Sequence, residues 1–262
     1  MTTDIASAPS SPHRINRIAT SDVFAALAEG WADFRHAPLI GLAFALPYVI
    51  AGLIVYLQLQ VWGQTWWILP IAVGFPLVAP FAAVGLYEVS RRLEAGLPLD
   101  WGEIFGVVIR QKDRQIPSMA AVVIVFFLFW IYAAHLVFAL FLGLKPMTNI
   151  MSSVDVFLTP TGLIMLLVGT IVGAALATAL YAITVVALPM LLHREVDFVT
   201  AMIASVGVCL QNPMPMLLFG LVVSGVLFAG MIPVFLGLFI VLPLLGHATW
   251  RLYRRAISYD DD

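Results

Sequence analysis

The chain has 262 residues and a formal net charge of −2, and 62% of its residues are hydrophobic while only 11% are charged. A soluble domain carries roughly 25% charged residues, so this composition, with a mean hydropathy of +1.01, excludes a soluble globular protein and predicts one embedded in lipid. The lack of a basic excess excludes a nucleic-acid-binding surface, and the single cysteine, Cys209, excludes an internal disulfide and a multi-cysteine metal or iron–sulfur site.

The two ends of the chain are polar. Residues 1–19 are rich in Ser, Pro and Thr and predict a disordered cytosolic tail. No apolar core follows at the distance typical of a signal peptide, so we expect no cleavage there. Residues 258–262 end on three aspartates and predict a short acidic tail.

Six apolar stretches are long enough to cross about 30 Å of hydrocarbon at ~1.5 Å per residue. We expect transmembrane helices at residues 38–60, 66–90, 117–143, 160–192, 213–230 and 233–256. Pro189 is expected to bend the end of the fourth. With six spans, all arginines fall on one side of the membrane and only Lys145 falls on the other. The positive-inside rule then predicts that both termini are cytosolic.

A short pattern that occurs three times organises these stretches. Asp22, Asp100 and Asp197 are each followed by apolar residues at offsets of one, five and nine, and by a proline at offsets of 16, 17 and 16. This internal repeat predicts three units, at residues 20–97, 98–194 and 195–257, each with a cytosolic interfacial helix and two spans. Two spans per unit make the repeats parallel. A pseudo-threefold bundle is the natural arrangement, and a tandem of hairpins is the alternative.

The segment after each aspartate has helical periodicity with one apolar face. Each is predicted to lie flat at the cytosolic interface and to turn into the membrane at the proline. Asp22, Asp100 and Asp197 are predicted helix N-caps. The large apolar side chains predicted to face the interface are Trp31, Phe34, Trp101, Phe105, Phe198 and Met202.

Ionisable groups inside spans are the usual indicators of function in membrane proteins. Glu88 precedes Arg91 and Arg92 by three and four residues, and this spacing predicts an interfacial ion pair rather than a proton or cation site. His135 and His247 are the histidines deep in spans. Their different depths favour hydrogen-bonded helix packing, and ligation of haem b is the alternative.

Small residues at helical spacing predict close helix packing in lipid. They line the fourth and fifth spans at Gly169, Gly173, Ala177, Gly220 and Ser224, and we interpret them as contacts within the chain. The sequence contains no phosphate-binding loop, nucleophile elbow, zinc-protease motif or carboxylate pair. We therefore predict no catalytic residue, no metal site, no cofactor apart from the haem alternative, and no enzymatic activity.

Three segments resemble a bacterial family of predicted six-helix integral membrane proteins that is catalogued as a domain of unknown function. They are residues 22–38 (DVFAALAEGWADFRHAP), residues 87–101 (YEVSRRLEAGLPLDW) and the segment from Asp197. The resemblance implies a bacterial inner-membrane protein. Some members are automatically labelled cytochrome c oxidase subunits. A haem–copper core subunit needs more histidine ligands than His135 and His247, whereas an accessory subunit needs none.

The leading functional hypothesis is a non-catalytic inner-membrane protein that acts by helix packing. Apolar spans without buried charge and abundant small residues favour an accessory or assembly subunit of a larger, for example respiratory, membrane complex. Its partners are then the lipid bilayer and other membrane subunits. A transporter or channel for an apolar or neutral solute is the first alternative, and a b-type haem protein is the second.

Overall fold

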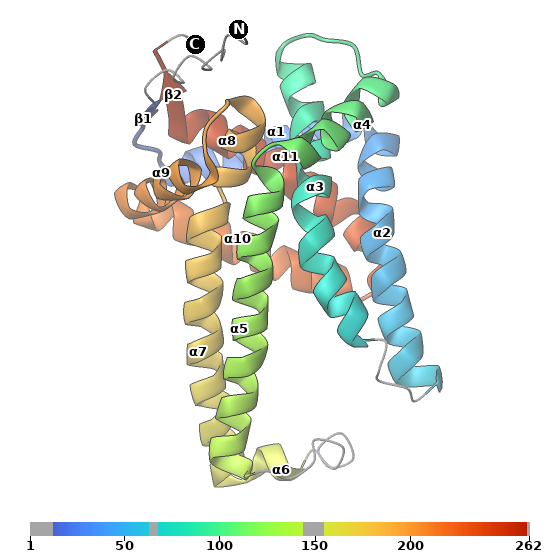
Figure 1. The fold of residues 1–262 in the computed structure, drawn as a ribbon, viewed down its shortest axis with the longest axis vertical. Coiled ribbons are helices and arrows are strands. Elements are labelled where there is room, and N and C mark those ends of the chain that lie inside the picture. The colour runs from blue at the N-terminus through green and yellow to red at the C-terminus, as the bar shows by residue number, and fades with distance from the viewer. Residues whose placement is uncertain (1–12, 63–67, 144–154, 261–262) are drawn as a thin grey trace, which may run out of the picture. The chain divides into compact units, whose positions relative to one another are not determined.

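The computed structural model describes residues 13–62, 68–143 and 155–260, and shows helices joined by short connections with one small sheet (Figure 1). It divides into a first compact unit, residues 1–120 and 182–262, and a second, residues 121–181. Residues 1–12 and 261–262 of the predicted tails, the first two residues of the span at 66–90, and Lys145 lie outside the described residues.

The first unit contains most of the helices. Its N-terminal part comprises α1 (Thr20–His36), α2 (Pro38–Leu57) with the π-helical turn η1 (Gln58–Trp62), α3 (Ile68–Glu94), α4 (Trp101–Arg110) and the 3-10 turn η2 (Gln111–Asp113). Its C-terminal part comprises α8 (Ala187–His193), α9 (Phe198–Gln211), α10 (Pro213–Met231) and α11 (Leu238–Ala256). The second unit holds most of α5 (Ile116–Leu142) and α7 (Pro160–Thr184), with α6 (Asp155–Leu158) between them.

The protein is an all-α membrane protein, and four stretches of its described helices are long and apolar enough to cross a bilayer. They are Pro38–Val61, Ile116–Leu142, Pro160–His193 and Pro213–Met231. α3 and α11, which overlap the predicted spans 66–90 and 233–256, are not among them. α11 ends in a charged turn with three arginines, Arg251, Arg254 and Arg255, and the side chains of residues 68–78 of α3 lie outside the described ones.

The repeated segments form α1, α4 and α9. Asp100 and Asp197 are N-caps, because their carboxylates accept hydrogen bonds from the N–H groups of Glu103 (2.8 Å) and Thr200 (2.9 Å). The prediction that Asp22 is an N-cap is wrong. α1 begins at Thr20, and Asp22 accepts a bond from the N–H of Ala19 at 2.7 Å, the return bond of a capping box.

The backbone turns that precede Pro38, Pro117 and Pro213 explain why the proline follows the aspartate at offsets of 16, 17 and 16. Ala37 (φ −132°, ψ 52°) and Asn212 (φ −127°, ψ 55°) have nearly the same backbone conformation, each directly before the proline that starts α2 or α10. Between α4 and α5 the chain instead passes through the 3-10 turn η2. This turn accommodates the one extra residue of the middle repeat.

The helix after Thr184 breaks before it resumes as α8, in agreement with the bend expected at Pro189. Proline removes a backbone donor and clashes with the preceding turn. The N–H of Val186 is satisfied from α9, where the Ser205 hydroxyl accepts it at 3.1 Å. The break therefore also fixes α8 against α9.

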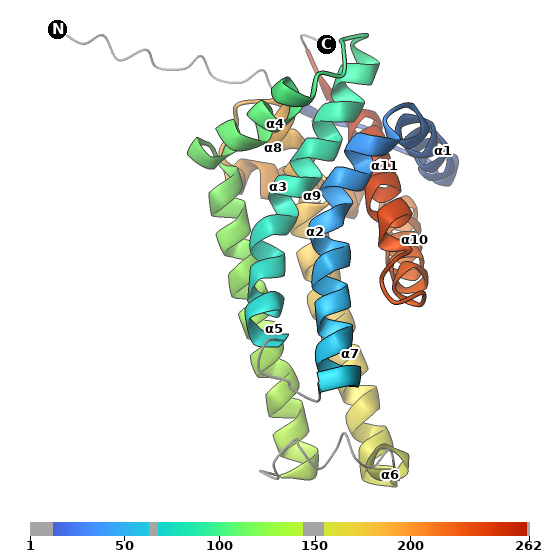
Figure 2. The ribbon, with the colours of Figure 1, turned by 90° about the vertical axis from the view of Figure 1, so that its right-hand side faces the viewer.

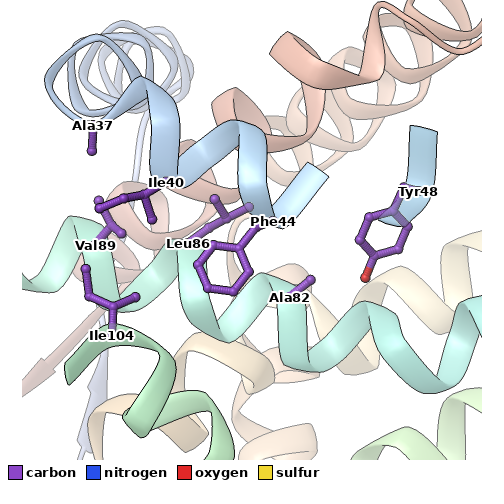
Figure 3. Packing of buried hydrophobic residues seen from close by; sticks show 8 residues of the cluster. All are labelled: Ala37, Ile40, Phe44, Tyr48, Ala82, Leu86, Val89 and Ile104. Carbon is purple, nitrogen blue, oxygen red and sulfur yellow. The ribbon is translucent and has the colours of Figure 1, made fainter. Parts of the chain in front are cut away.

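One apolar core joins α2, α3 and α4. Figure 3 shows Ile40 and Phe44 of α2 facing Leu86 and Val89 of α3, with Ile104 of α4 beside them; Ala37, Tyr48 and Ala82 complete the cluster. The ring of Phe44 also stacks on that of Phe105, with centroids 4.9 Å apart. This core fixes α4 against the end of the α2–α3 hairpin.

α1 packs along α11, beside α2 (Figure 2). The two backbones approach so closely at Gly30 that a Cβ there would lie 2.6 Å from the backbone nitrogen of Ala248. Gly41 of α2 has a similar role, because its Cβ would lie 2.9 Å from Pro243 of α11. The first and last helices of the first unit thus share a tight seam.

The chain ends are tied to each other as well. β1 (His13–Ile15) pairs antiparallel with β2 (Ile257–Tyr259), with Ile15 opposite Ile257. Asn212 accepts a hydrogen bond from the N–H of Ile18 (2.9 Å) and donates to the carbonyl of Asn16 (3.0 Å). Residues 13–19 and 258–259 thus differ from the tails expected there, because backbone pairing between distant segments has no local sequence signature.

Candidate functional site

A buried polar cluster lies where α1, α3 and α11 meet. Asp33 of α1 forms a two-bond ion pair with Arg251 of α11, at 2.7 and 2.8 Å. Ser90 of α3 donates to the Asp33 carboxylate at 2.8 Å, and its oxygen lies 2.9 Å from Nδ1 of His247. Asp33 is 5% exposed, and Ser90 and His247 are fully buried. We call these four residues the Asp33–Arg251 network.

The order of the hydrogen-bonded groups in this network determines whether Ser90 can act as a nucleophile. Because the Ser90 hydroxyl donates to Asp33, it accepts from His247, which therefore carries its proton on Nδ1. A nucleophilic serine requires the histidine between the serine and the carboxylate, and access to substrate. Here the serine lies in the middle and is enclosed. The network is therefore suited to holding three helices together rather than to attacking a substrate.

A second ion-pair group surrounds Glu88, which is 1% exposed. Its carboxylate accepts from Arg91 (2.7 and 2.8 Å) and from Arg92 (2.8 Å). Arg92 also pairs with Glu103 of α4 at 2.6 Å and donates to the carbonyl of Pro98 at 2.8 Å. The predicted trio is in contact, and it additionally ties α3 to α4.

Every arginine at the end of α11 has an acidic partner. Besides the Asp33 pair, Arg254 contacts Glu94 of α3 at 3.0 Å, and Arg255 contacts Glu29 of α1. Glu94 also accepts a hydrogen bond from the indole of Trp250 at 2.9 Å. The basic residues that indicate membrane orientation therefore also join α11 to α1 and α3.

Aromatic rings surround His193 at the end of α8. Its Nδ1 lies 2.8 Å from the Tyr253 hydroxyl, and the rings of Trp250, Tyr253 and Tyr259 stand edge-on to it, with centroids 5.5 to 5.8 Å away. The guanidinium of Arg194 lies 4.3 Å above the ring of Tyr259. This cluster connects α8 to α11 and β2.

The structure places the two histidines proposed for haem in different settings. His247 lies in the first unit, fully buried in the Asp33–Arg251 network, and its Nε2 has no hydrogen-bond partner in the described part of the chain. His135 lies in the second unit, exposed, with Nδ1 2.8 Å from the carbonyl of Ile131. Each histidine already uses Nδ1 within its own unit.

The predicted interfacial residues divide between two sides of their helices. Phe34 is buried against the unit, whereas Trp31, Trp101 and Phe105 are 38–44% exposed. On α9 the buried side consists of Ala201, Ala204, Ser205 and Val208, and Phe198 and Met202 are half-buried. Each of the three helices thus packs one side on the unit and presents apolar side chains on another.

The small residues predicted to line the fourth and fifth spans differ in burial. Gly169 and Gly173 are half-buried, and a Cβ on them would make ordinary contacts with Val137 (3.8 Å) and Trp130 (3.7 Å) of α5. Ala177 and Ser224 are exposed, and Gly220 is half-buried. Tighter contacts lie at other glycines of the described chain, among them Gly30, Gly41 and Gly85.

No role and no partner was predicted for Asp33, which shares the polar face of the first repeated helix with Glu29. Arg251 was used only as an orientation signal, and Ser90 was not singled out. The available signal was the presence of carboxylates on that face and of three arginines at the end of the last helix. The single cysteine, Cys209, is half-buried in α9, and burial raises the pKa of its thiol to about 11, which keeps it protonated.

Comparison with known proteins identifies one family. Residues 68–193 match the model of the family described as "Predicted integral membrane protein (DUF2189)", which is a domain of unknown function. This confirms the family resemblance for that part of the chain. No curated protein and no solved structure matches.

Proposed function

We propose that the protein is a non-catalytic subunit of the bacterial cytoplasmic (inner) membrane that acts through helix packing, as an accessory or assembly component of a larger membrane complex. One observation carries this proposal. The spans Ile116–Leu142 and Pro160–His193 have only 6% of their apolar windows buried within the chain. Such helices offer nearly their whole surface to lipid or to other membrane helices.

The charged side chains of the first unit support the same conclusion. Asp33 and the arginines of α11 are engaged in pairs that join the helices of this unit. Glu88 pairs within α3 with Arg92, which in turn pairs with Glu103 of α4. A buried pair of this kind stabilises a helix arrangement only while both partners are present. We therefore assign these groups a structural role and assign the protein no enzymatic activity.

Six spans in three parallel repeats, with both termini cytosolic, form part of the proposal. The nearly identical backbone at Ala37 and Asn212 supports equivalence of the first and third repeats. The equivalent N-caps Asp100 and Asp197 support that of the second and third. The one-sided distribution of arginines supports the orientation.

Photo-crosslinking in native membranes tests the accessory role. A photoreactive amino acid is placed at Leu167 or Ile171 of α7, which are 61% and 60% exposed, and at Leu221 of α10 as a control of equal exposure (62%). We expect discrete protein adducts from α7 above the background at Leu221. The adducts are then identified by mass spectrometry and matched to subunits that co-purify in mild detergent.

Equal background at all three positions, together with a protein that purifies alone, contradicts the accessory role. Solute flux into liposomes containing the purified protein would then favour the transporter alternative. A Soret band in its visible spectrum would favour the haem alternative.

A further inference from the structure

The exposed face of α5 carries two polar side chains among apolar ones. Val125, Phe129, Tyr132 and Leu136 are exposed and recur at helical spacing, and His135 lies on the same face. Tyr132 is 65% exposed. The stripe therefore presents one hydroxyl and one imidazole, a single helical turn apart.

The opposite face of α5 has a partner. Trp130 and Val137 point towards Gly173 and Gly169 of α7, at 3.7 and 3.8 Å from where a Cβ would stand. These residues lie roughly 140–160° around the helix from Tyr132, at 100° per residue. The Tyr132 stripe is thus not the surface through which α5 contacts α7.

Both polar groups lie inside the hydrocarbon. The helix Ile116–Leu142 is a span of 27 residues centred on residue 129. Tyr132 and His135 then lie ~4.5 and ~9 Å from its centre at 1.5 Å per residue, within the ~15 Å half-thickness of the bilayer core. A hydroxyl or imidazole that faces lipid at this depth is costly, and such groups in spans face protein or water.

The hydrogen bonding of His135 determines what its free edge can bind. Its Nδ1 lies 2.8 Å from the carbonyl of Ile131, which can only accept, so Nδ1 carries the proton of the neutral ring. Nε2 is therefore an acceptor. The Tyr132 hydroxyl is a donor, so the stripe contains both halves of an O–H···N hydrogen bond.

We propose that this stripe is the interface between two copies of the chain, related by a twofold axis along the membrane normal. Two copies insert in the same orientation, so equivalent residues lie at equal depth. Tyr132 of each copy then donates to Nε2 of His135 in the other, and the symmetry makes two such bonds. The apolar residues of the stripe pack around this pair. The proposal depends on α5 being a span and not on membership of a larger complex.

Disulfide cross-linking in native membranes tests the interface. In a Cys209→Ala background, cysteines are introduced at Val125 or Ala139, each seven residues from Tyr132 and so on the same line along the helix. Matched controls carry Val123→Cys or Val137→Cys on the opposite face. We expect oxidation to give a species of twice the chain mass of 28.6 kDa for the first pair only.

The polar pair is tested in the Val125→Cys background. Tyr132→Phe combined with His135→Leu removes both hydrogen bonds and retains an apolar stripe. We expect dimerisation to weaken about eightfold, the effect of losing two interhelical hydrogen bonds of average strength. Thr178→Val on α7 is the control, because that hydroxyl already donates to the carbonyl of Ala174 at 2.8 Å, and we expect no change.

Three outcomes overturn the proposal. Cross-linking of the control positions equal to that of Val125 and Ala139 removes the assigned face. A chain that stays at single mass at every position removes the dimer, as does an adduct at Val125 to a protein of different mass. Dimerisation unchanged by the Tyr132→Phe, His135→Leu variant removes the polar pair as its cause.

Discussion

Replacing Arg251 with methionine is expected to destabilise the first unit by about 3–5 kcal/mol. The substitution leaves the Asp33 carboxylate, whose side chain is only 7% exposed, with the Ser90 hydroxyl but without its counter-charge. A buried charge that has lost its partner is among the more costly changes in a folded protein. Because the Arg251 side chain is itself 18% exposed and admits some water, we expect a value near the lower end.

The double variant separates the lost charge pair from lost packing. Asp33→Leu with Arg251→Met replaces both charges with apolar groups of similar volume, and we expect it to be more stable than Arg251→Met alone. The control is Glu195→Gln, which breaks an exposed pair with Arg114 whose side chains are 33% and 75% exposed. An exposed pair contributes roughly 0–1 kcal/mol.

The measurement is equilibrium unfolding in mixed micelles of mild detergent and dodecyl sulfate, followed by tryptophan fluorescence. The reasoning is refuted if Arg251→Met costs no more than Glu195→Gln. It is also refuted if the double variant loses as much stability as the sum of its two single variants, because the pair would then have no coupling energy.

Three further predictions concern backbone contact, capping and topology. Gly30→Ala is expected to lower unfolding stability by about 1–3 kcal/mol because its Cβ meets the α11 backbone, whereas Gly225→Ala, with open space around it in the described structure, is expected to be neutral or slightly stabilising. Asp197→Ala is expected to cost about 1 kcal/mol near pH 7. The Thr200 hydroxyl, in the first turn of α9, donates a hydrogen bond that holds the pKa of Asp197 below its usual 3.8. The stability difference between wild type and Asp197→Ala is therefore fully present above pH 3.8. It is lost as the pH falls through the lower pKa that Asp197 has in the folded state. In a cysteine-free background, a cysteine that replaces Leu97 is expected to react with a membrane-impermeant reagent only from the cytosolic side. A cysteine that replaces Ile232 is expected to react only from the outer side. Labelling of the Leu97 position from the outer side would instead support four spans.

Features with a local signature were predicted from the sequence. The four spans of the described residues follow from apolar runs, and the caps Asp100 and Asp197 follow from side chains placed before an apolar period. Asp22 was misplaced by three residues because an acidic residue at the N-cap and one at the third helical position both satisfy free N–H groups. Local spacing does not distinguish these two positions.

Features that join distant segments were not predicted. Asp33 and Arg251 are 218 residues apart, and one residue's periodicity carries no information about the other. The small residues illustrate the same limit. Glycines at helical spacing marked the fourth and fifth spans, but a close approach of two helix backbones formed at Gly30, a lone glycine on a helix that carries charge. Spacing indicates which residues share a face, and only the fold determines which face receives a neighbour.

The contacts between the chain's two ends bear on how the proposed repeats are arranged. In a tandem of hairpins the middle repeat separates the first from the third, so α1 and α11 would not meet. Here α1 packs along α11, their charged side chains pair, and β1 pairs with β2. The first and second repeats also meet where α3 contacts α4, and the second and third meet where α8 contacts α9. Within the first unit, helices assigned to each of the three proposed repeats thus contact helices of the other two, whereas a tandem of hairpins predicts no contact between the first repeat and the third.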